Sequence, residues 1–314
     1  MLINIGLLIL GLFILIIGGD FLVRGASSIA LRAHLSPLVV GLTIVAFGTS
    51  VPELLISLNA AISGHPDLAM GNVVGSNICN LALVLGVTVL IGPVKVQSDS
   101  IKIDWPVAMI SALLLFWWSQ NGSLGLSEGI FFVVFLISYV IFIIRKSRKE
   151  NIAALADALE VPDGPSSSIW LDLFYIVIGG VGLFYGSDWF VGGAKELATF
   201  LGVSQRIIGI TVLALGTSLP ELVTAIVASF KRETDLALGN LVGSNIFNIL
   251  SILGITAIVK PIHVNETIIW IDMLWMLGIT LLILPMMLIQ RKLGKPEGII
   301  LLLIYVYYTY TVIS

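Results

Sequence analysis

Charged residues are scarce in this sequence and make up only 11% of its 314 residues. A soluble domain carries about 25% charged residues. Hydrophobic residues reach 58%, and the mean hydropathy is +1.07. These values exclude an ordinary soluble domain and predict an integral membrane protein.

Cysteine and histidine are also rare. The single cysteine, Cys79, excludes a framework of internal disulfide bonds. The three histidines lie between the apolar runs, so these runs contain neither a Ser–His pair nor a histidine cluster of the kind that hydrolases use. We therefore expect no enzymatic activity and no bound cofactor.

Ten apolar runs are each about 20 residues long, the length of a helix that crosses a bilayer. The first run has no basic segment before it and no small-residue cleavage pattern after it, so it is predicted to be a span and not a signal peptide. The predicted fold is all-α with ten transmembrane helices. The predicted spans are 2–23, 38–63, 68–91, 104–120, 126–144, 169–190, 205–230, 236–258, 268–290 and 298–313.

Basic residues gather on one set of alternate loops. This set holds 13 of the 16 lysines and arginines: Arg24, Arg32, Lys95, Lys102, Arg145, Lys146, Arg148, Lys149, Lys231, Arg232, Arg291, Lys292 and Lys295. Cytoplasmic loops carry an excess of Lys and Arg. We therefore expect a multi-pass plasma membrane protein with both termini outside the cell.

One segment of the sequence is present twice, at an offset of 168 residues. Between 67–80 and 235–248, 11 of 14 residues are identical. The predicted organisation is a first five-helix repeat at 1–144 with its motif at 41–86, a cytoplasmic hinge loop at 145–168, and a second repeat at 169–314 with its motif at 209–254. Because five spans reverse the direction of the chain, the two repeats are predicted to be inverted, as in many secondary transporters.

The repeat places one glutamate within an apolar run in each half. Gly48-Thr49-Ser50-Val51-Pro52-Glu53 returns as Gly216-Thr217-Ser218-Leu219-Pro220-Glu221. An ionisable group at this depth is costly and usually functional. Each proline removes a backbone hydrogen bond, so we expect a kink or an unwound turn just before each glutamate. The carboxylates and the neighbouring hydroxyls are oxygen ligands suited to Na⁺, Ca²⁺ or Mg²⁺. Back-bonding to the helix is the alternative role for these hydroxyls.

The second repeated motif brings amides into the membrane. Asn77 and Asn80, like Asn245 and Asn248, are three residues apart and so share a helix face. At least one amide of each pair is expected to reach the ion site, and helix packing is the alternative role.

Together, Gly-Thr-Ser-Val/Leu-Pro-Glu and Gly-Asn-x-Val-Gly-Ser-Asn-Ile-x-Asn, each present twice, resemble the α-repeats of the sodium/calcium exchanger family in the cation/calcium antiporter superfamily. The chain resembles the short prokaryotic members, without the calcium-sensing domains of animal exchangers. The resemblance implies alternating access, in which the first and sixth spans slide against a core of eight helices. It also implies a set of ion ligands: Glu53 and Glu221 as competitive Ca²⁺ and Na⁺ ligands, Thr49, Ser50, Thr217 and Ser218 through hydroxyls or carbonyls, Ala46 and Ala214 through backbone carbonyls, Ser76 and Ser244 through hydroxyls, and Asn80 through its amide.

The sequence departs from the family pattern at Asn248, where many members have Asp. Asn248 is kept as a candidate ligand, with a packing role as the alternative, and the inferred site retains two carboxylates. The expected function is Ca²⁺ export in exchange for Na⁺, and the alternative is Ca²⁺/H⁺ exchange. A passive channel and an intramembrane enzyme are weaker alternatives. The expected partners are Ca²⁺, Na⁺ or H⁺ and the lipid bilayer, without nucleic acid, and the sequence leaves the oligomeric state open, a monomer included.

Overall fold

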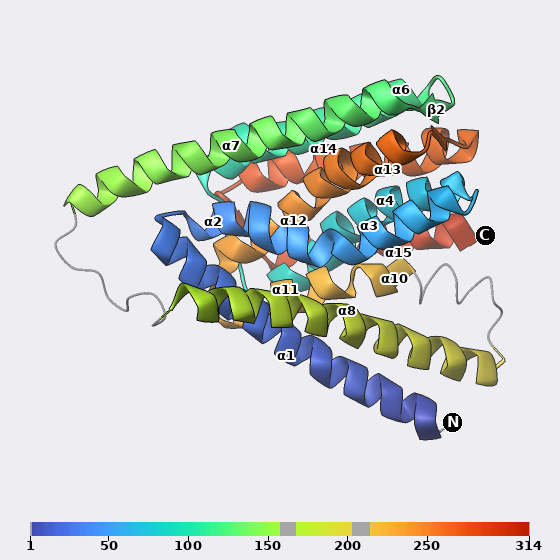
Figure 1. Ribbon diagram of the computed structural model, residues 1–314, viewed down its shortest axis with the longest axis horizontal. Helices are drawn as coiled ribbons and strands as arrows, with labels where there is room; N and C mark the ends of the chain where they lie inside the picture. The colour runs from blue at the N-terminus through green and yellow to red at the C-terminus, as the bar shows by residue number, and fades with distance from the viewer. Residues whose placement is uncertain (1, 158–167, 203–213, 314) are drawn as a thin grey trace.

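The computed structural model describes residues 2–157, 168–202 and 214–313. They form a bundle of long helices with two short two-stranded sheets (Figure 1). The first part of the chain contains α1 (Leu2–Ala33), α2 (Pro37–Val40), α3 (Ala46–Ile62), α4 (Pro66–Ile78), α5 (Leu85–Ile91), β1 (Val94–Lys95), α6 (Trp105–Ser119), β2 (Ser123–Leu124) and α7 (Leu126–Asp157). The second part contains α8 (Ile169–Phe200), α10 (Ala214–Thr217), α11 (Leu219–Phe230), α12 (Thr234–Phe247), α13 (Gly254–Val259), β3 (Ile262–His263), α14 (Met273–Leu288), β4 (Lys292–Leu293) and α15 (Lys295–Ile313).

Five described segments are π-helical; three of them join two α-helices into a longer rod, and the segments at 100–104 and 268–272 lead into α6 and α14. The five segments are Gly41–Val45, Cys79–Val84, Ser100–Asp104, Asn248–Leu253 and Ile268–Asp272. Such wide turns are frequent at functional sites. Two of them begin at or next to the predicted amide ligands.

Eight described helical stretches are long and apolar enough to cross a membrane, as befits an all-helical membrane protein. They correspond to the first six predicted spans and to the eighth and ninth. The seventh predicted span is described only from Ala214 onward, and its apolar helix Leu219–Phe230 is shorter. The tenth corresponds to α15, a helix of 19 residues that is not among those eight.

Several helices continue beyond their predicted ends. Helix α1 ends at Ala33 instead of residue 23, and α8 ends at Phe200 instead of residue 190. Helix α7 ends at Asp157, so the prediction of a loop is wrong for residues 145–157. This stretch contains no Gly or Pro and is rich in helix formers, and Lys146 pairs with Glu150 one turn later at 3.2 Å. Residues 158–167 of the predicted hinge lie outside the described residues.

Helices α1 and α8 form a close pair along one side of the bundle (Figure 1). At Gly18 of α1, an added Cβ would lie 2.8 Å from the backbone nitrogen of Leu183 in α8. At Gly179 of α8, an added Cβ would lie 2.6 Å from the backbone nitrogen of Leu22 in α1. Glycine is required at these crossings because the two backbones touch, as in small-residue packing of membrane helices.

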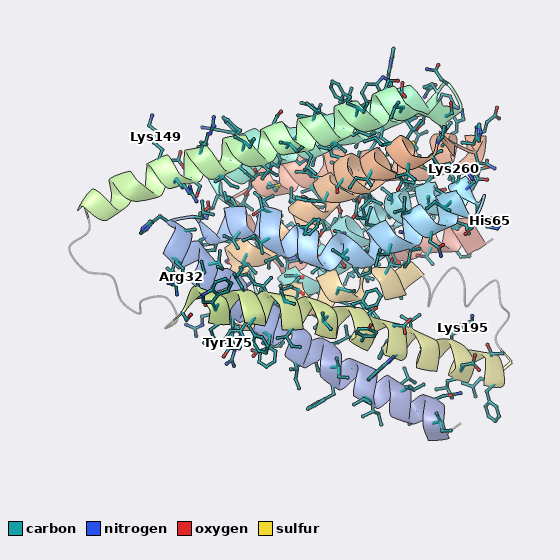
Figure 2. The ribbon with its side chains drawn as sticks, in the orientation of Figure 1. Arg32, His65, Lys149, Tyr175, Lys195 and Lys260 are labelled. Atoms are coloured by element: carbon teal, nitrogen blue, oxygen red, sulfur yellow. The ribbon has the colours of Figure 1, made fainter. Side chains whose placement is uncertain are left out.

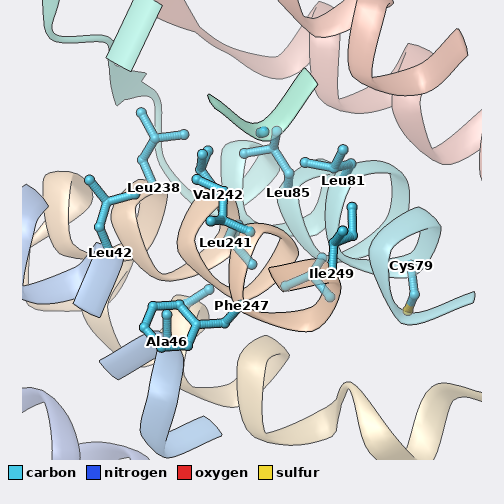
Figure 3. Packing of buried hydrophobic residues seen from close by; sticks show 14 of the residues in the cluster. Leu42, Ala46, Cys79, Leu81, Leu85, Leu238, Leu241, Val242, Phe247 and Ile249 are labelled. Carbon is cyan, nitrogen blue, oxygen red and sulfur yellow. The ribbon is translucent and has the colours of Figure 1, made fainter. Parts of the chain in front are cut away.

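The core lies around α12 and the π-helical segment that follows it. In the most apolar stretch of the span Thr234–Val259, 83% of the residues are buried inside the protein. The corresponding share is 28% in the span that contains α1. Figure 3 shows Leu241, Phe247 and Ile249 of this segment between Ala46 on one side and Cys79 on the other. The motif-bearing helices therefore pack against one another at the centre, and the span that contains α1 is far less enclosed.

The two parts of the chain exchange matching contacts. Strand β1 pairs with β4 and strand β2 pairs with β3, both antiparallel. In each part a tyrosine donates to an aspartate: Tyr139 to Asp104 at 2.9 Å, and Tyr308 to Asp272 at 3.0 Å.

The long helices run between two ends of the bundle (Figure 1). Figure 2 shows Arg32 and Lys149 at one end and His65, Lys195 and Lys260 at the other. We call the first the basic end and the second the opposite end. The marked N and C termini both lie at the opposite end (Figure 1).

Candidate ion-binding site

The two repeated glutamates lie on different helices, and both are inside the protein. Glu53 is on α3 and Glu221 is in the first turn of α11. Both side chains are fully buried, and they lie close enough for their charges to repel. None of their four carboxylate oxygens has a hydrogen-bond partner. A buried carboxylate without a partner is strongly unfavourable, so this arrangement requires a cation or protons.

Hydroxyl groups from both parts of the chain surround the Glu221 carboxylate. Thr49, Ser50 and Ser244 lie beside it. The Thr49 hydroxyl is 3.4 Å from that of Ser244, and it also lies 3.3 Å from the Ala46 carbonyl, to which it donates. The first contact joins the two repeated motifs, and the second is the back-bonding alternative, so Thr49 takes part in both.

A matching pair of hydroxyls joins the motifs a second time. Ser76 on α4 lies 3.3 Å from Thr217 on α10. Its repeat equivalent is the contact between Thr49 and Ser244, at the same offset of 168 residues. Predicted ligands that are far apart in sequence are therefore brought together in two equivalent pairs.

The amides divide into bonded and unbonded groups. Both polar atoms of Asn80 are buried without a partner. Asn248 donates its Nδ2 to Asn77 Oδ1 at 3.0 Å, and its own Oδ1 has no partner. Asn77 and Asn245 each donate to the backbone carbonyl of the other at 3.2 Å. Asn80 thus has its Oδ1 free to bind a cation, whereas Asn248 uses its nitrogen to bond to Asn77 and keeps its own Oδ1 available.

The prediction of a distorted helix before each glutamate is right in one half only. Helix α10 ends at Thr217 and α11 begins at Leu219, so the helix is interrupted at Ser218, whose buried hydroxyl has no partner. Helix α3 runs through Pro52 without a break. In that half the irregularity lies earlier, in the π-helical segment that ends at Val45. Pro220 lies in the first turn of α11, where a helix tolerates proline because the missing N–H has no intrahelical acceptor. Pro52 lies inside α3, where proline usually kinks a helix, yet α3 continues through it.

Sequence reasoning missed one contact of the interrupted helix. Pro220 cannot donate to the carbonyl of Gly216, and Ser187 of α8 donates to that carbonyl instead, at 2.6 Å. Its repeat equivalent is Gly19, which has no hydroxyl, so the repeat gave no signal for it. Ala214 begins α10, and its side chain lies outside what the structure describes.

A cavity of about 820 Å³ leads to the site from the opposite end. It lies between α3, α4, α8 and α10, and it extends from Ser76 and Thr217 to Asn59 and Leu68 beside the α3–α4 turn. At the other side of the site, Lys231 after α11 is bonded to Asp20 of α1 at 2.6 Å. The described residues therefore provide a cavity on one side of the site and an ion pair on the other.

The chemistry of the site is that of oxygen donors. Among the described residues, no group of three or more His, Cys, Asp or Glu side chains is placed to hold a metal ion. Two carboxylates with hydroxyl and amide oxygens suit a hard cation that is bound transiently. A membrane-embedded helical bundle with this site defines a cation transporter.

Comparison with known proteins identifies the family. The family model described as sodium/calcium exchanger protein matches residues 3–145 and 171–314. CaxA of Alkalimonas amylolytica is 39% identical over 315 residues, covering 98% of this chain and 97% of that protein. The sodium/calcium exchanger MaX1 of Methanosarcina acetivorans is 33% identical over 339 residues, covering 97% of each.

A solved structure of the sodium-calcium exchanger NCX_Mj superposes with a TM-score of 0.84 at 29% identity, covering 99% of each chain. The chain belongs to the sodium/calcium exchanger family, whose members are membrane antiporters and not enzymes.

Proposed function

We propose that this protein exports Ca²⁺ in exchange for Na⁺ by alternating access, with both ions bound at Glu53 and Glu221. The observation that carries the proposal is the pair of fully buried carboxylates whose oxygens have no protein partner. One Ca²⁺ balances their two negative charges. Relatives named as sodium/calcium exchangers support the choice of ions.

The architecture proposed for this function is ten spans in two inverted repeats. The equivalent pairs Thr49–Ser244 and Ser76–Thr217 support it, as do the reciprocal bonds of Asn77 and Asn245. These contacts are those expected around a pseudo-twofold axis in the membrane plane. With the basic end in the cytoplasm, both termini lie outside the cell.

Competition between the ions follows from charge. A bound Ca²⁺ already neutralises Glu53 and Glu221, so adding Na⁺ to the same buried carboxylates would leave an uncompensated positive charge, which is costly. The site therefore holds either Ca²⁺ or Na⁺. Transport is then an exchange if the protein cannot switch between outward and inward access while the site is empty and doubly negative.

The moving part in this proposal is the pair α1 and α8. The two helices are closely packed on each other through glycines, whereas α12 and its neighbours form the enclosed core. The cavity at the opposite end and the bond between Asp20 and Lys231 at the basic side support a state with outward access. Sliding of α1 would break this bond and open the other side.

Ca²⁺/H⁺ exchange is the second candidate, and the Asn248 position favours it. With Asn in place of the Asp found in many members, the site has two carboxylates, and two protons discharge it as completely as Ca²⁺ does. The test uses proteoliposomes loaded with Ca²⁺ and given either a Na⁺ gradient or a pH gradient. Efflux driven by Na⁺ at equal pH supports the proposal. Efflux driven by pH alone, with Na⁺ inert, overturns it in favour of protons.

A further inference from the structure

A second cavity lies at the basic end, apart from the glutamates. Its volume is about 340 Å³, and it is enclosed by the start of α2, the segment from Gln97 to Asp104, and α7. None of the proposed ion ligands lines it. Helix α2 continues through a π-helical segment into α3, which carries Glu53.

Asp104 gives this cavity a deeply buried carboxyl group with one oxygen that has no partner. Its side chain is 2% exposed. Tyr139 donates to its Oδ1 at 2.9 Å, but its Oδ2 is buried without a partner. An ionised buried carboxylate with one bare oxygen is costly unless a positive charge meets it.

The other charged groups of the cavity are already paired with one another. Lys146 is bonded to Asp99 and, at 3.2 Å, to Glu150. The Glu150 side chain is 58% exposed, so water screens its charge. Lys146 lies within electrostatic range of Asp104, but its ion pairs are with the other two carboxylates, Asp99 and Glu150. Asp104 is thus the one deeply buried carboxylate in this lining that lacks a cation.

We propose that this cavity binds one hard monovalent cation, Na⁺ or K⁺, on Oδ2 of Asp104. One free buried carboxylate balances one positive charge. Neutral oxygens complete the site: the hydroxyls of Ser36 and Ser147, and the side-chain carbonyl of Gln97, whose Nε2 is occupied by Asp235 at 2.6 Å. Oxygen-only donors select hard cations. A divalent ion would need a second free carboxylate, and the other two in this lining, Asp99 and Glu150, are paired with Lys146.

The occupant would fix the start of α2 against α7. Because α2 leads directly into α3, the second site is connected to the transport site through one continuous helical rod. The cation at the basic end is therefore expected to stabilise the protein without itself being carried between the glutamates.

The test removes the central site first. In the double variant Glu53→Gln and Glu221→Gln, thermal unfolding is followed while NaCl, KCl or CaCl₂ replaces choline chloride at constant ionic strength. The unfolding temperature should rise saturably with Na⁺ or K⁺, on the order of 2–4 °C per tenfold increase above the dissociation constant. Adding Asp104→Asn, which keeps the size and the bond to Tyr139, should abolish the rise.

Asp272→Asn is the matched control, because Asp272 accepts from Tyr308 at 3.0 Å but does not line this cavity. It should leave the rise unchanged. Whichever of Na⁺ and K⁺ acts more strongly identifies the physiological occupant. A response that survives Asp104→Asn, no saturable response to either ion, or a stronger response to Ca²⁺ overturns the proposal. If the double variant does not fold, the same comparison is made with the central site saturated by Ca²⁺.

Discussion

Replacement of Glu221 by Gln isolates the contribution of one charge to the proposed transport site. Gln has nearly the same size and one oxygen in place of two, so the change removes the charge and one acceptor with little change in volume. Bound Ca²⁺ would then face Glu53 only and keep one uncompensated positive charge in a fully buried site.

The magnitude follows from the cost of breaking a buried ion pair. Removing one partner of such a pair costs about 3–5 kcal/mol. At about 1.4 kcal/mol for each factor of ten, this corresponds to roughly 10²- to 10⁴-fold weaker Ca²⁺ binding. The ion-free protein should not lose stability, because the substitution removes the repulsion between two buried carboxylates that lack partners.

The assay measures Ca²⁺-dependent stabilisation against unfolding and Ca²⁺ uptake into proteoliposomes on the same preparation. Glu128→Gln is the control, because Glu128 accepts from the backbone nitrogen of Gly125 at the start of α7, away from the site. Loss of both signals in Glu221→Gln alone supports the reasoning. Ca²⁺ binding as tight as in the wild type would refute the assignment of Glu221 as a ligand.

Three further outcomes are expected. Gly179→Ala should destabilise the protein by about 1–3 kcal/mol, because its Cβ would lie 2.6 Å from an α1 backbone nitrogen; Gly180→Ala, with nothing within 4 Å, should be neutral in thermal unfolding. Asp20→Asn should weaken the ion pair with Lys231. A thiol reagent added from the basic end should then label a cysteine introduced beside the glutamates faster, and unchanged labelling would contradict a role of this ion pair in closing that side. Burial and a neighbouring carboxylate raise the pKa of Glu233 above 4.5, so its contribution to stability is present below pH 4.5 and is lost as the pH rises through the raised value. Glu233→Gln should flatten this decline in unfolding temperature, and an unaltered pH profile would show that the shift is absent.

Much of the fold class was predictable because it depends on composition and local pattern. Scarce charge and long apolar runs predicted an all-helical membrane protein, and the duplicated motif predicted membership of the sodium/calcium exchanger family. The prediction of a loop at 145–157 was wrong, because hydrophilic sequence was taken for irregular structure. Residues with high helix propensity continue α7 through this stretch to Asp157.

The candidate site was predictable as a set of residues but not as a set of contacts. The repeat indicated Glu53 and Glu221, yet it treated the two halves as equal. The structure interrupts the helix at Ser218 and leaves α3 continuous through Pro52. Which of two similar segments is interrupted depends on what packs around each. Only the second half has a serine, Ser187, that donates to the carbonyl of Gly216.

The sequence by itself determined that the protein lies in a membrane, that its motif is duplicated and which oxygen-bearing side chains are available, because hydropathy, spacing and residue type are local properties. Only the tertiary structure decided that Asn248 donates to Asn77, that Gly18 lies against α8, and that Asp104 keeps a bare oxygen in a cavity. Each of these depends on atoms that are far apart in the chain and meet only when the helices pack. The physical reason is that helix packing decides which of the many polar groups in the sequence find a protein partner and which remain without one.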